Sequence, residues 1–339
     1  TVVAGSGNIL ISTGSSSDGG FESIPVGNAK VSISSNVVTI NPAGTFASST
    51  AYNVQVPATA FDDASGNSYA GITNATTLNF TSADVVAPTL SSSSPADGAT
   101  GVGVNANIVL TFSETVVAGS GNILISTGSS SDGGFESIPV GNAKVSISSN
   151  VVTINPAGTF ASSTAYNVQV PATAFDDAAG NSYAGITNAT TLNFTSADVV
   201  APTISSVTST TSDGTYGIGD EINVTVNFSE AVTLSGGNLV VTLETGDTDQ
   251  TVTISSISSA TSASGTYTVQ SGDASSDLSV STIALSAGTL SDAASNNMSS
   301  FSIPSGSNLA DSEAFVVDGT APTMTIATTL AITPEVTTF

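Results

Sequence analysis

The chain has 339 residues, of which 26 are acidic and two are basic, and its formal net charge is −24. Binding to phosphates needs clustered Lys and Arg, so this composition argues against a nucleic-acid partner and against an anionic membrane surface. The chain contains no Cys and no His, which excludes disulfides, thiolate nucleophiles, Ser-His-Asp catalysis and the usual zinc ligands. No apolar run is long enough to predict direct insertion into a membrane.

One long segment of the sequence occurs twice. Thr1–Thr89 returns as Thr115–Thr203, shifted by 114 positions, with one difference, Ser65 against Ala179. Solenoid repeats are much shorter, so this period indicates one domain per repeat. A near-identical tandem copy suits a spacer that works by its length. An enzyme gains little from a second active site in series, and we expect no catalysis.

The second copy has apolar residues at alternate positions in runs bounded by Gly, Asn, Asp and Ser, which is typical of β-strands. No segment has a sustained helical period. The expected strands are, in chain order, Thr89–Ser93, Asn107–Phe112, Asn122–Ser126, Phe135–Val140, Ala143–Ser148, Val151–Asn155, Ala165–Ala174 and Thr190–Thr195. This number of strands in one repeat predicts an all-β fold of antiparallel immunoglobulin-like sandwiches.

The repeat frame also gives the domain boundaries. We predict an immunoglobulin-like domain at 1–86 that lacks its first two strands, a complete one at 87–200, and a divergent one at 201–320. A strand-forming tail is expected at 321–339. The linkers between domains are short and each is followed by a proline, which restricts the backbone. We therefore expect tandem domains arranged end to end as a rod.

Several motifs resemble a known family. APTLSSSSPADGATGVGVNANIVLTFSE at Ala87–Glu114, together with the motif FDDASGN at 61–67, resembles the bacterial Ig-like repeats of surface-layer proteins and large adhesins. In the third unit, YGIGDEINVTVNFSEAV and FVVDGTAPT resemble related repeats of long extracellular proteins. The resemblance implies an extracellular protein of the cell surface whose domains extend, assemble or adhere, often with bound calcium.

Acidic residues recur at three places: in the linker before Ala-Pro, after the second expected strand, and in the turn after the seventh. The two loops lie at one pole of an immunoglobulin-like sandwich, where the linker also enters. The expected groups are Asp84, Glu114, Asp176, Asp177 and Asn181 at one junction, and Asp198, Glu230, Asp292 and Asn296 at the next. The corresponding residues at the two ends are Asp62, Asp63 and Asn67 in the first repeat, and Asp318 in the last linker.

Clustered oxygen ligands without nearby cations favour Ca²⁺, which accepts six to eight oxygens in flexible geometry. We therefore expect calcium at the domain junctions. An ordinary turn is the alternative, because Asp-Xaa-Xaa-Gly-Asn also forms where Gly supplies a positive φ and Asp bonds its own backbone.

Two structural roles follow from the sequence. In the first, the chain is a subunit of a filament or surface layer. The tail 321–339 of one copy would then complete the first repeat of the next, giving a head-to-tail polymer by strand addition. In that polymer Asp318 would join Asp62, Asp63 and Asn67 between subunits. In the second, the chain is a rigid extender of an adhesin whose ligand-binding module lies elsewhere.

Overall fold

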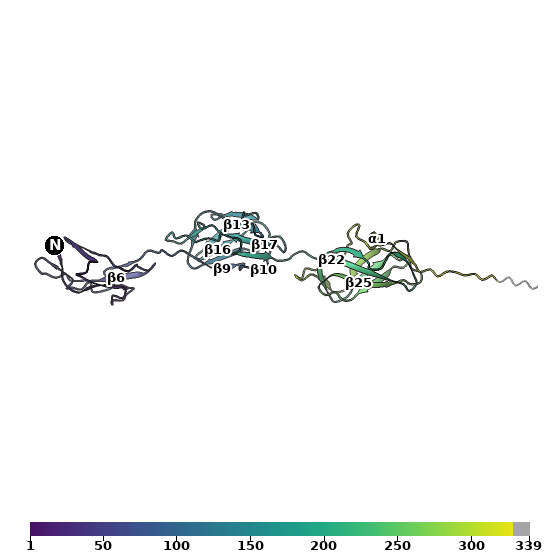
Figure 1. Ribbon diagram of the computed structural model, residues 1–339, viewed down its shortest axis with the longest axis horizontal. Helices are drawn as coiled ribbons and strands as arrows, with labels where there is room; N and C mark the ends of the chain where they lie inside the picture. Colours follow the sequence, from purple (N-terminus) through teal and green to yellow (C-terminus); the bar gives the residue numbers. More distant parts are fainter. Residues whose placement is uncertain (328–339) are drawn as a thin grey trace, which may run out of the picture. The chain divides into compact units, whose positions relative to one another are not determined.

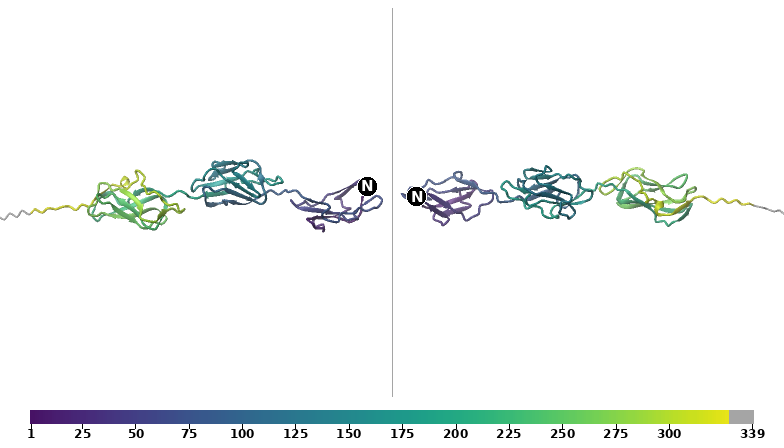
Figure 2. Two further views of the ribbon diagram at one scale, coloured as in Figure 1. Left: turned by 180° about the vertical axis from the view of Figure 1, so that it is seen from behind. Right: turned by 90° about the horizontal axis from the view of Figure 1, so that it is seen from above.

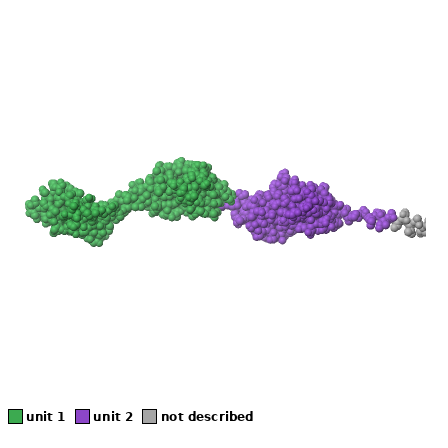
Figure 3. Space-filling view, in the orientation of Figure 1, with its two compact units in different colours: residues 1–196 green, residues 197–339 purple. Residues whose placement is uncertain are grey.

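The computed structural model describes residues 1–327 and divides the chain into two compact units, Thr1–Ser196 and the part from Ala197 onward (Figure 3). The first unit contains two separate hydrophobic cores, one in each copy of the repeat, and the second unit contains a third core. The boundary between the units lies at Ala197, slightly before the predicted boundary at 201.

The second repeat is a sandwich of two main sheets (Figure 1). One sheet has the order β10-β19-β17-β13-β14 and the other β15-β16-β11-β9, and β12 pairs with β18 separately. The strands are β9 (Leu90–Ser94), β10 (Ala99–Val102), β11 (Ile108–Phe112), β12 (Val117–Ala118), β13 (Asn122–Thr127), β14 (Glu136–Pro139), β15 (Val145–Ser148), β16 (Val151–Ile154), β17 (Ala165–Gln169), β18 (Phe175–Asp176) and β19 (Asn193–Ser196). This architecture confirms the predicted all-β class.

Apolar side chains at alternate positions of β11 pack into the core of this sandwich. Ile108, Leu110 and Phe112 are at most 1% exposed, while the residues between them are partly exposed. The ring of Phe112 contacts those of Phe175 and Tyr183, with centroids 5.4 and 5.1 Å apart. Burying one such side chain contributes about 1.5–3 kcal/mol, so this strand is a large part of the stability of the repeat.

The observed strands differ from the expected ones in detail. The expected strand Ala165–Ala174 ends at Gln169, because Pro171 has no N–H to donate and only an isolated bridge at Val170 continues the pairing. The strand β10 was not predicted, since its sequence Ala-Thr-Gly-Val is short and contains glycine. It pairs parallel to β19, whereas the expected sheets were antiparallel throughout.

The first repeat forms the strands that the repeated sequence encodes. They are β1 (Val2–Ala4), β2 (Asn8–Thr13), β3 (Glu22–Pro25), β4 (Val31–Ser34), β5 (Val37–Ile40), β6 (Ala51–Gln55), β7 (Phe61–Asp63) and β8 (Asn79–Thr81). They pair as β3-β2-β6-β8, β4-β5 and β1-β7. The described residues before Asp84 contain no counterparts of β9, β10 and β11, so this repeat has fewer strands than the second (Figure 2).

The second unit keeps the sandwich plan with a different sequence. Its sheets are β20-β22-β25 with β28 beside β22, then β21-β29-β26, and β24-β23-β27. The strands are β20 (Ile204–Thr208), β21 (Gly214–Gly217), β22 (Glu221–Ser235), β23 (Leu239–Leu243), β24 (Gln250–Ile254), β25 (Ala260–Thr268), β26 (Ala274–Ser275), β27 (Val280–Leu285), β28 (Thr289–Ser291) and β29 (Phe315–Asp318). A single helical turn, α1 (Leu309–Ser312), was not predicted and begins at an Asn308 cap.

A buried carboxylate supports the second unit near β29. Asp273 is 3% exposed and accepts hydrogen bonds from Tyr267 Oη at 2.6 Å, Gln250 Nε2 at 3.0 Å and Gln270 N at 2.8 Å. Burial, and then the bond to Asp273, raises the pKa of the Tyr267 hydroxyl far above its ordinary value. The Tyr267 hydroxyl thus donates a hydrogen bond to a carboxylate that is almost fully buried.

We expect Tyr267→Phe to lower the free energy of unfolding of the second unit by about 2 kcal/mol, because it removes a bond to a buried charge. Denaturant unfolding measures this loss in the free energy of unfolding. Tyr216→Phe is the matched control, since the Tyr216 hydroxyl donates to the Ser212 carbonyl at an exposed site. Equal losses in the two variants would contradict a special role for Asp273.

The predicted tail lies only partly within the described part of the chain. Residues 321–327 contain no strand, and Met324 and Ile326 are 82% and 73% exposed. The rest of the tail, 328–339, lies outside the described residues, so its predicted strands remain a prediction.

Candidate functional site: two groups of carboxylates

The turn after β18 fixes the carboxylate of Asp177. Asp177 Oδ1 accepts hydrogen bonds from the main-chain N–H groups of Ala179, at 2.9 Å, and Asn181, at 2.8 Å. Gly180 has φ +92°, a left-handed conformation that glycine adopts without strain. The sequence Asp-Ala-Ala-Gly-Asn thus forms a tight loop around its own first side chain, and Asp177 is 4% exposed.

Asn181 connects this turn to the linker. Its Nδ2 donates to Asp177 Oδ2 at 2.7 Å and to the main-chain oxygen of Asp84 at 3.3 Å. The sequence-based prediction placed Asn181 among the ligands. In the structure its amide nitrogen orients a carboxylate and the linker backbone. The role of Asn181 as a ligand stays a prediction.

Asp84 is held from the side of the first repeat. Its Oδ1 accepts hydrogen bonds from Ser48 Oγ at 2.8 Å and from Val86 N at 3.0 Å. Ser48 Oγ in turn accepts from Val85 N at 2.9 Å. Sequence reasoning missed Ser48, because one serine in a Ser-rich loop carries no distinctive signal.

Glu114 completes the first acid group, which we define as Asp84, Glu114 and Asp177. One carboxylate oxygen from each of the three lies within 4.8 Å of the other two. Glu114 reaches this point because it follows β11 at the pole where the linker enters the domain. The structure therefore brings together three of the residues expected at this junction.

The second acid group comprises Asp198, Glu230 and Asp292, with the same 4.8 Å limit between their carboxylate oxygens. Asn296 repeats the role of Asn181, since its Nδ2 donates to Asp292 Oδ2 at 2.8 Å and to the Asp198 main-chain oxygen at 3.3 Å. Ser295 replaces the turn glycine and still adopts φ +71°. The turn thus forms despite a substitution that disfavours it.

The other predicted residues lie outside these groups. Asp176 points away, and its Oδ1 accepts from Ser182 Oγ at 2.5 Å. Asp176 is the last residue of β18, whereas Asp177 lies in the turn that follows, and only Asp177 belongs to the first acid group. In the first repeat Asp62 accepts from Ser68 Oγ at 2.7 Å, and Asp63 accepts from Asn67 Nδ2 at 2.8 Å.

Asp63 and Asn67 thus form the same turn as Asp177 and Asn181, without a linker Asp or a strand-end Glu beside them among residues 1–327. Asp318 Oδ1 accepts from Thr320 N at 3.1 Å and belongs to no carboxylate group in that range. The expected contact of Asp318 with the first repeat of another chain remains a prediction.

Each acid group consists of three carboxylates and contains no basic residue. Burial, and then the carboxylates of Asp84 and Asp177, raise the pKa of Glu114. Burial, and then Asp292 and Asp198, raise the pKa of Glu230 in the same way. The bonds from Asn181 lower the pKa of Asp177.

Both lysines of the chain lie elsewhere, because Lys30 pairs with Glu22 and Lys144 with Glu136. The carboxylates within each acid group therefore repel one another unless a cation from solution binds between them.

Comparison with known families decides the identity of the domains. The sequence model of the bacterial Ig-like domain matches residues 4–82 and 84–196, more than half of the chain. The chain belongs to the bacterial Ig-like domain family. No curated protein sequence matches it significantly. Within the described part, no helix is long and apolar enough to cross a membrane.

The first match covers the first repeat, and the second match covers the linker residue Asp84 and the second repeat. All three residues of the first acid group lie inside the second match. Bacterial Ig-like domains are found in bacterial surface proteins, and they are typically structural rather than enzymatic.

The acid groups of these Ig-like domains fit a calcium ion by donor chemistry. Ligands at 2.3–2.6 Å from one Ca²⁺ lie at most about 5 Å apart, and the carboxylate oxygens of each group lie within 4.8 Å. Asp84, Glu114 and Asp177 would hold an ion at the first junction, and Asp198, Glu230 and Asp292 at the second. Such an ion would neutralise the charge and link each linker to the domain that follows it.

Glu114→Gln should have opposite effects with and without calcium. In chelator at pH 7 the variant is expected to be more stable than the parent, by less than about 1 kcal/mol, because repulsion between partly solvated charges is removed. With calcium it is expected to be less stable, because a ligand is lost. Thermal unfolding in both buffers measures the two signs. Glu136→Gln, which removes the partner of Lys144, is the control, and destabilisation independent of calcium is expected there.

The same residue predicts a pH dependence in chelator. The pKa of Glu114 is higher in the folded chain than in the unfolded chain, so the folded state binds more protons between the two values. Its contribution to stability is complete below the ordinary pKa of glutamate and is lost as pH rises through the raised pKa. Asp177 acts oppositely, since its pKa is lowered and its contribution is lost as pH falls through that value.

Proposed function

We propose that the chain is an extending part of an extracellular protein of the bacterial cell surface, in which calcium fixes successive Ig-like domains to one another. The observation that carries this proposal is the recurrence of one acid group at equivalent positions in two domains of different sequence. In each group an Asp of the linker lies beside a Glu and an Asp of the domain that follows. A cation shared between them would restrict the linker.

The distance between two domains tests this function. The chain has no cysteine, so Ser32→Cys and Ser146→Cys place one spin label on an exposed strand position of each repeat. Calcium is expected to narrow the distribution of label distances, and Asp177→Ala is expected to keep it broad. Identical distributions in calcium and in chelator would contradict the proposal.

A filament subunit is the second candidate function. The feature that favours it is the sequence of the tail, where Met324 and Ile326, and then Leu330 and Ile332, alternate as in a strand. Electron microscopy and sedimentation of the chain with and without 321–339 test this candidate. Fibres that need the tail would support strand addition between chains, whereas monomers at high concentration would favour the extender.

A further inference from the structure

The last strand of the second repeat pairs with an early strand that runs in the same direction. β19 ends at Ser196, and β10 lies parallel to it, with Ala99 opposite Phe194 and Val102 opposite Ser196. The other described strand pairs of this repeat are antiparallel. β10 therefore joins the N-terminal part of the domain directly to the strand from which the chain leaves it.

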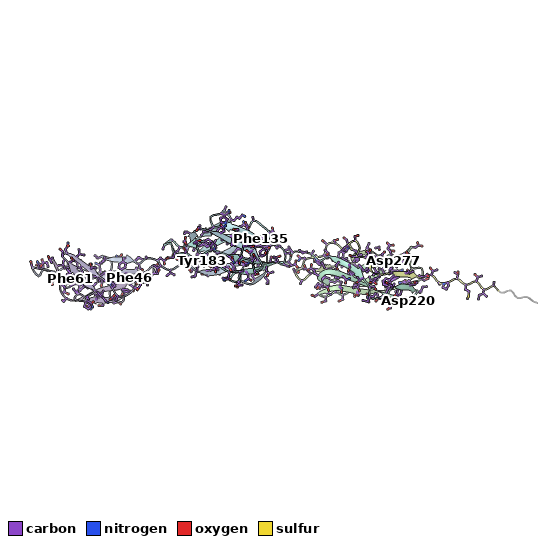
Figure 4. All side chains as sticks on the ribbon, turned by 45° about the horizontal axis from the view of Figure 1, so that its top comes forward. Phe46, Phe61, Phe135, Tyr183, Asp220 and Asp277 are labelled. Carbon is purple, nitrogen blue, oxygen red and sulfur yellow. The ribbon has the colours of Figure 1, made fainter. Side chains whose placement is uncertain are left out.

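The second unit has the same arrangement with a different sequence. β21 lies parallel to β29, the last strand, from Gly214 opposite Phe315 to Gly217 opposite Asp318. At the end of β21, Gly217 N donates a hydrogen bond to Asp220 Oδ2 at 2.8 Å, and Figure 4 labels Asp220. Two domains of unlike sequence thus contain the same parallel pair.

An Asp-Gly dipeptide holds the start of the parallel pair in the second repeat. Asp97 Oδ1 accepts a hydrogen bond from Asn193 N at 3.0 Å, and Gly98 N donates to the Asn193 carbonyl at 2.8 Å. Asn193 Nδ2 also donates to Asp97 Oδ1 at 2.7 Å. The first residue of β19 is therefore bound through both of its main-chain groups, and we call this arrangement the Asp-Gly clasp.

The second unit contains an equivalent Asp-Gly clasp. Asp213 Oδ1 accepts a hydrogen bond from Ala314 N at 2.8 Å, and Gly214 N donates to the Ala314 carbonyl at 3.2 Å. Asp97 and Asp213 each follow the first strand of their domain, β9 and β20. Hydrogen bonds to a carboxylate are stronger than those between neutral groups, so each clasp reinforces the short parallel pair beside it.

The chain enters and leaves the second repeat at opposite ends of its parallel pair. The linker enters beside Glu114 and Asp177. β17 runs toward the turn of Asp177, and its first residue, Ala165, lies opposite Thr195 near the end of β19. Ser196 therefore lies at the end of the domain remote from the linker. Tension along the chain pulls β10 toward the linker and β19 in the opposite direction.

Tension in these two directions slides the parallel strands past each other. The hydrogen bonds between them run across the strands, so the bonds of the pair and of the clasp share the load and break together. Strands that are opened from one end lose their bonds one after another, which needs less force. Resistance to forced unfolding is a matter of the unfolding rate, and the shared load lowers that rate.

We propose that the second repeat and the second unit bear mechanical load, and that the parallel strand pair with its Asp-Gly clasp is the element that resists it. This role goes beyond the proposed function, because extension alone requires no resistance to tension. It is also separate from calcium, because the clasp contains no residue of the two acid groups.

The direction of pulling tests the proposal without altering the clasp. The chain has no cysteine, so Val86→Cys and Val200→Cys attach the handles of magnetic tweezers to exposed linker positions and slide β10 along β19. Gly103→Cys with Val200→Cys instead opens the pair from one end. Gly103 is exposed, and a Cβ there meets no atom within 4 Å. At one fixed force we expect the second repeat to unfold about 100-fold faster in this second direction.

A substitution in the clasp tests its part in the resistance. With handles at positions 86 and 200, Asp97→Ala should unfold about tenfold faster at the same force, because the hydrogen bonds to its carboxylate are lost. Asp132→Ala is the matched control, since Asp132 also precedes a glycine but its Oδ1 accepts from Gly134 N within its own loop. We expect the control to unfold at the rate of the parent chain.

Equal unfolding rates in the two pulling directions would overturn the inference. An unchanged rate in Asp97→Ala, or an equal acceleration in Asp132→Ala, would overturn the role of the clasp. The same difference between directions in calcium and in chelator would support a load-bearing pair that is independent of the proposed calcium sites.

Discussion

Calcium in excess over chelator is expected to raise the melting temperature of the second repeat by about 10 °C. An ion that binds the folded state and not the unfolded chain adds about 2.7 kcal/mol at 100 times its dissociation constant. For a domain of this size each kcal/mol corresponds to roughly 4 °C. Differential scanning calorimetry measures the shift.

Single substitutions assign this shift to the first acid group. Asp84→Ala or Asp177→Ala should remove most of it, because each deletes one of three carboxylates within 4.8 Å. Asp176→Ala is the matched control, since Asp176 is the neighbour of Asp177 and bonds Ser182 instead. A full calcium shift in Asp177→Ala would place the ion elsewhere.

The second large effect is a difference in the loss of stability when the same leucine is substituted in each of the two repeats. Leu192→Ala should destabilise the second repeat by about 3 kcal/mol, within the range for a buried leucine, because Leu192 is 1% exposed. Leu78→Ala is the same substitution in the same local sequence, and it should cost less than about 1 kcal/mol because Leu78 is 43% exposed. Hydrogen exchange of each repeat reports the two losses separately.

The substitutions Leu78→Ala and Leu192→Ala together measure how far Leu78 is exposed to solvent in the first repeat. Equal losses at Leu78 and Leu192 would mean that another segment covers the first repeat.

The sequence was sufficient to predict the β-sandwich, because its apolar alternation specifies strands directly. Ile108, Leu110 and Phe112 were expected on one face, and all three lie in the core. The strand β10 and the helical turn α1 could not be predicted. Both are short, and their positions depend on tertiary partners, namely β19 for β10 and Val280 for the Asn308 cap.

The acid groups were predictable because the pole of the sandwich collects the ends of particular strands. Asp84, Glu114 and Asp177 follow from that topology. The choice between Asp176 and Asp177 required the structure, because one of these adjacent acids ends β18 and the other begins the turn after it. The hydrogen bonds by which Asn181 and Ser48 orient Asp84 could not be predicted from the sequence, because a Ser-rich or Asn-rich loop offers many equivalent donors.

Titration of Ca²⁺ into the chelator-treated chain by isothermal calorimetry tests the central claim most directly. We expect two binding events from the described acid groups, of which Asp177→Ala removes one and Asp292→Ala removes the other. The double variant should bind neither ion while keeping its circular dichroism spectrum. Undiminished binding in the double variant, or no binding by the parent chain, would contradict calcium at the domain junctions.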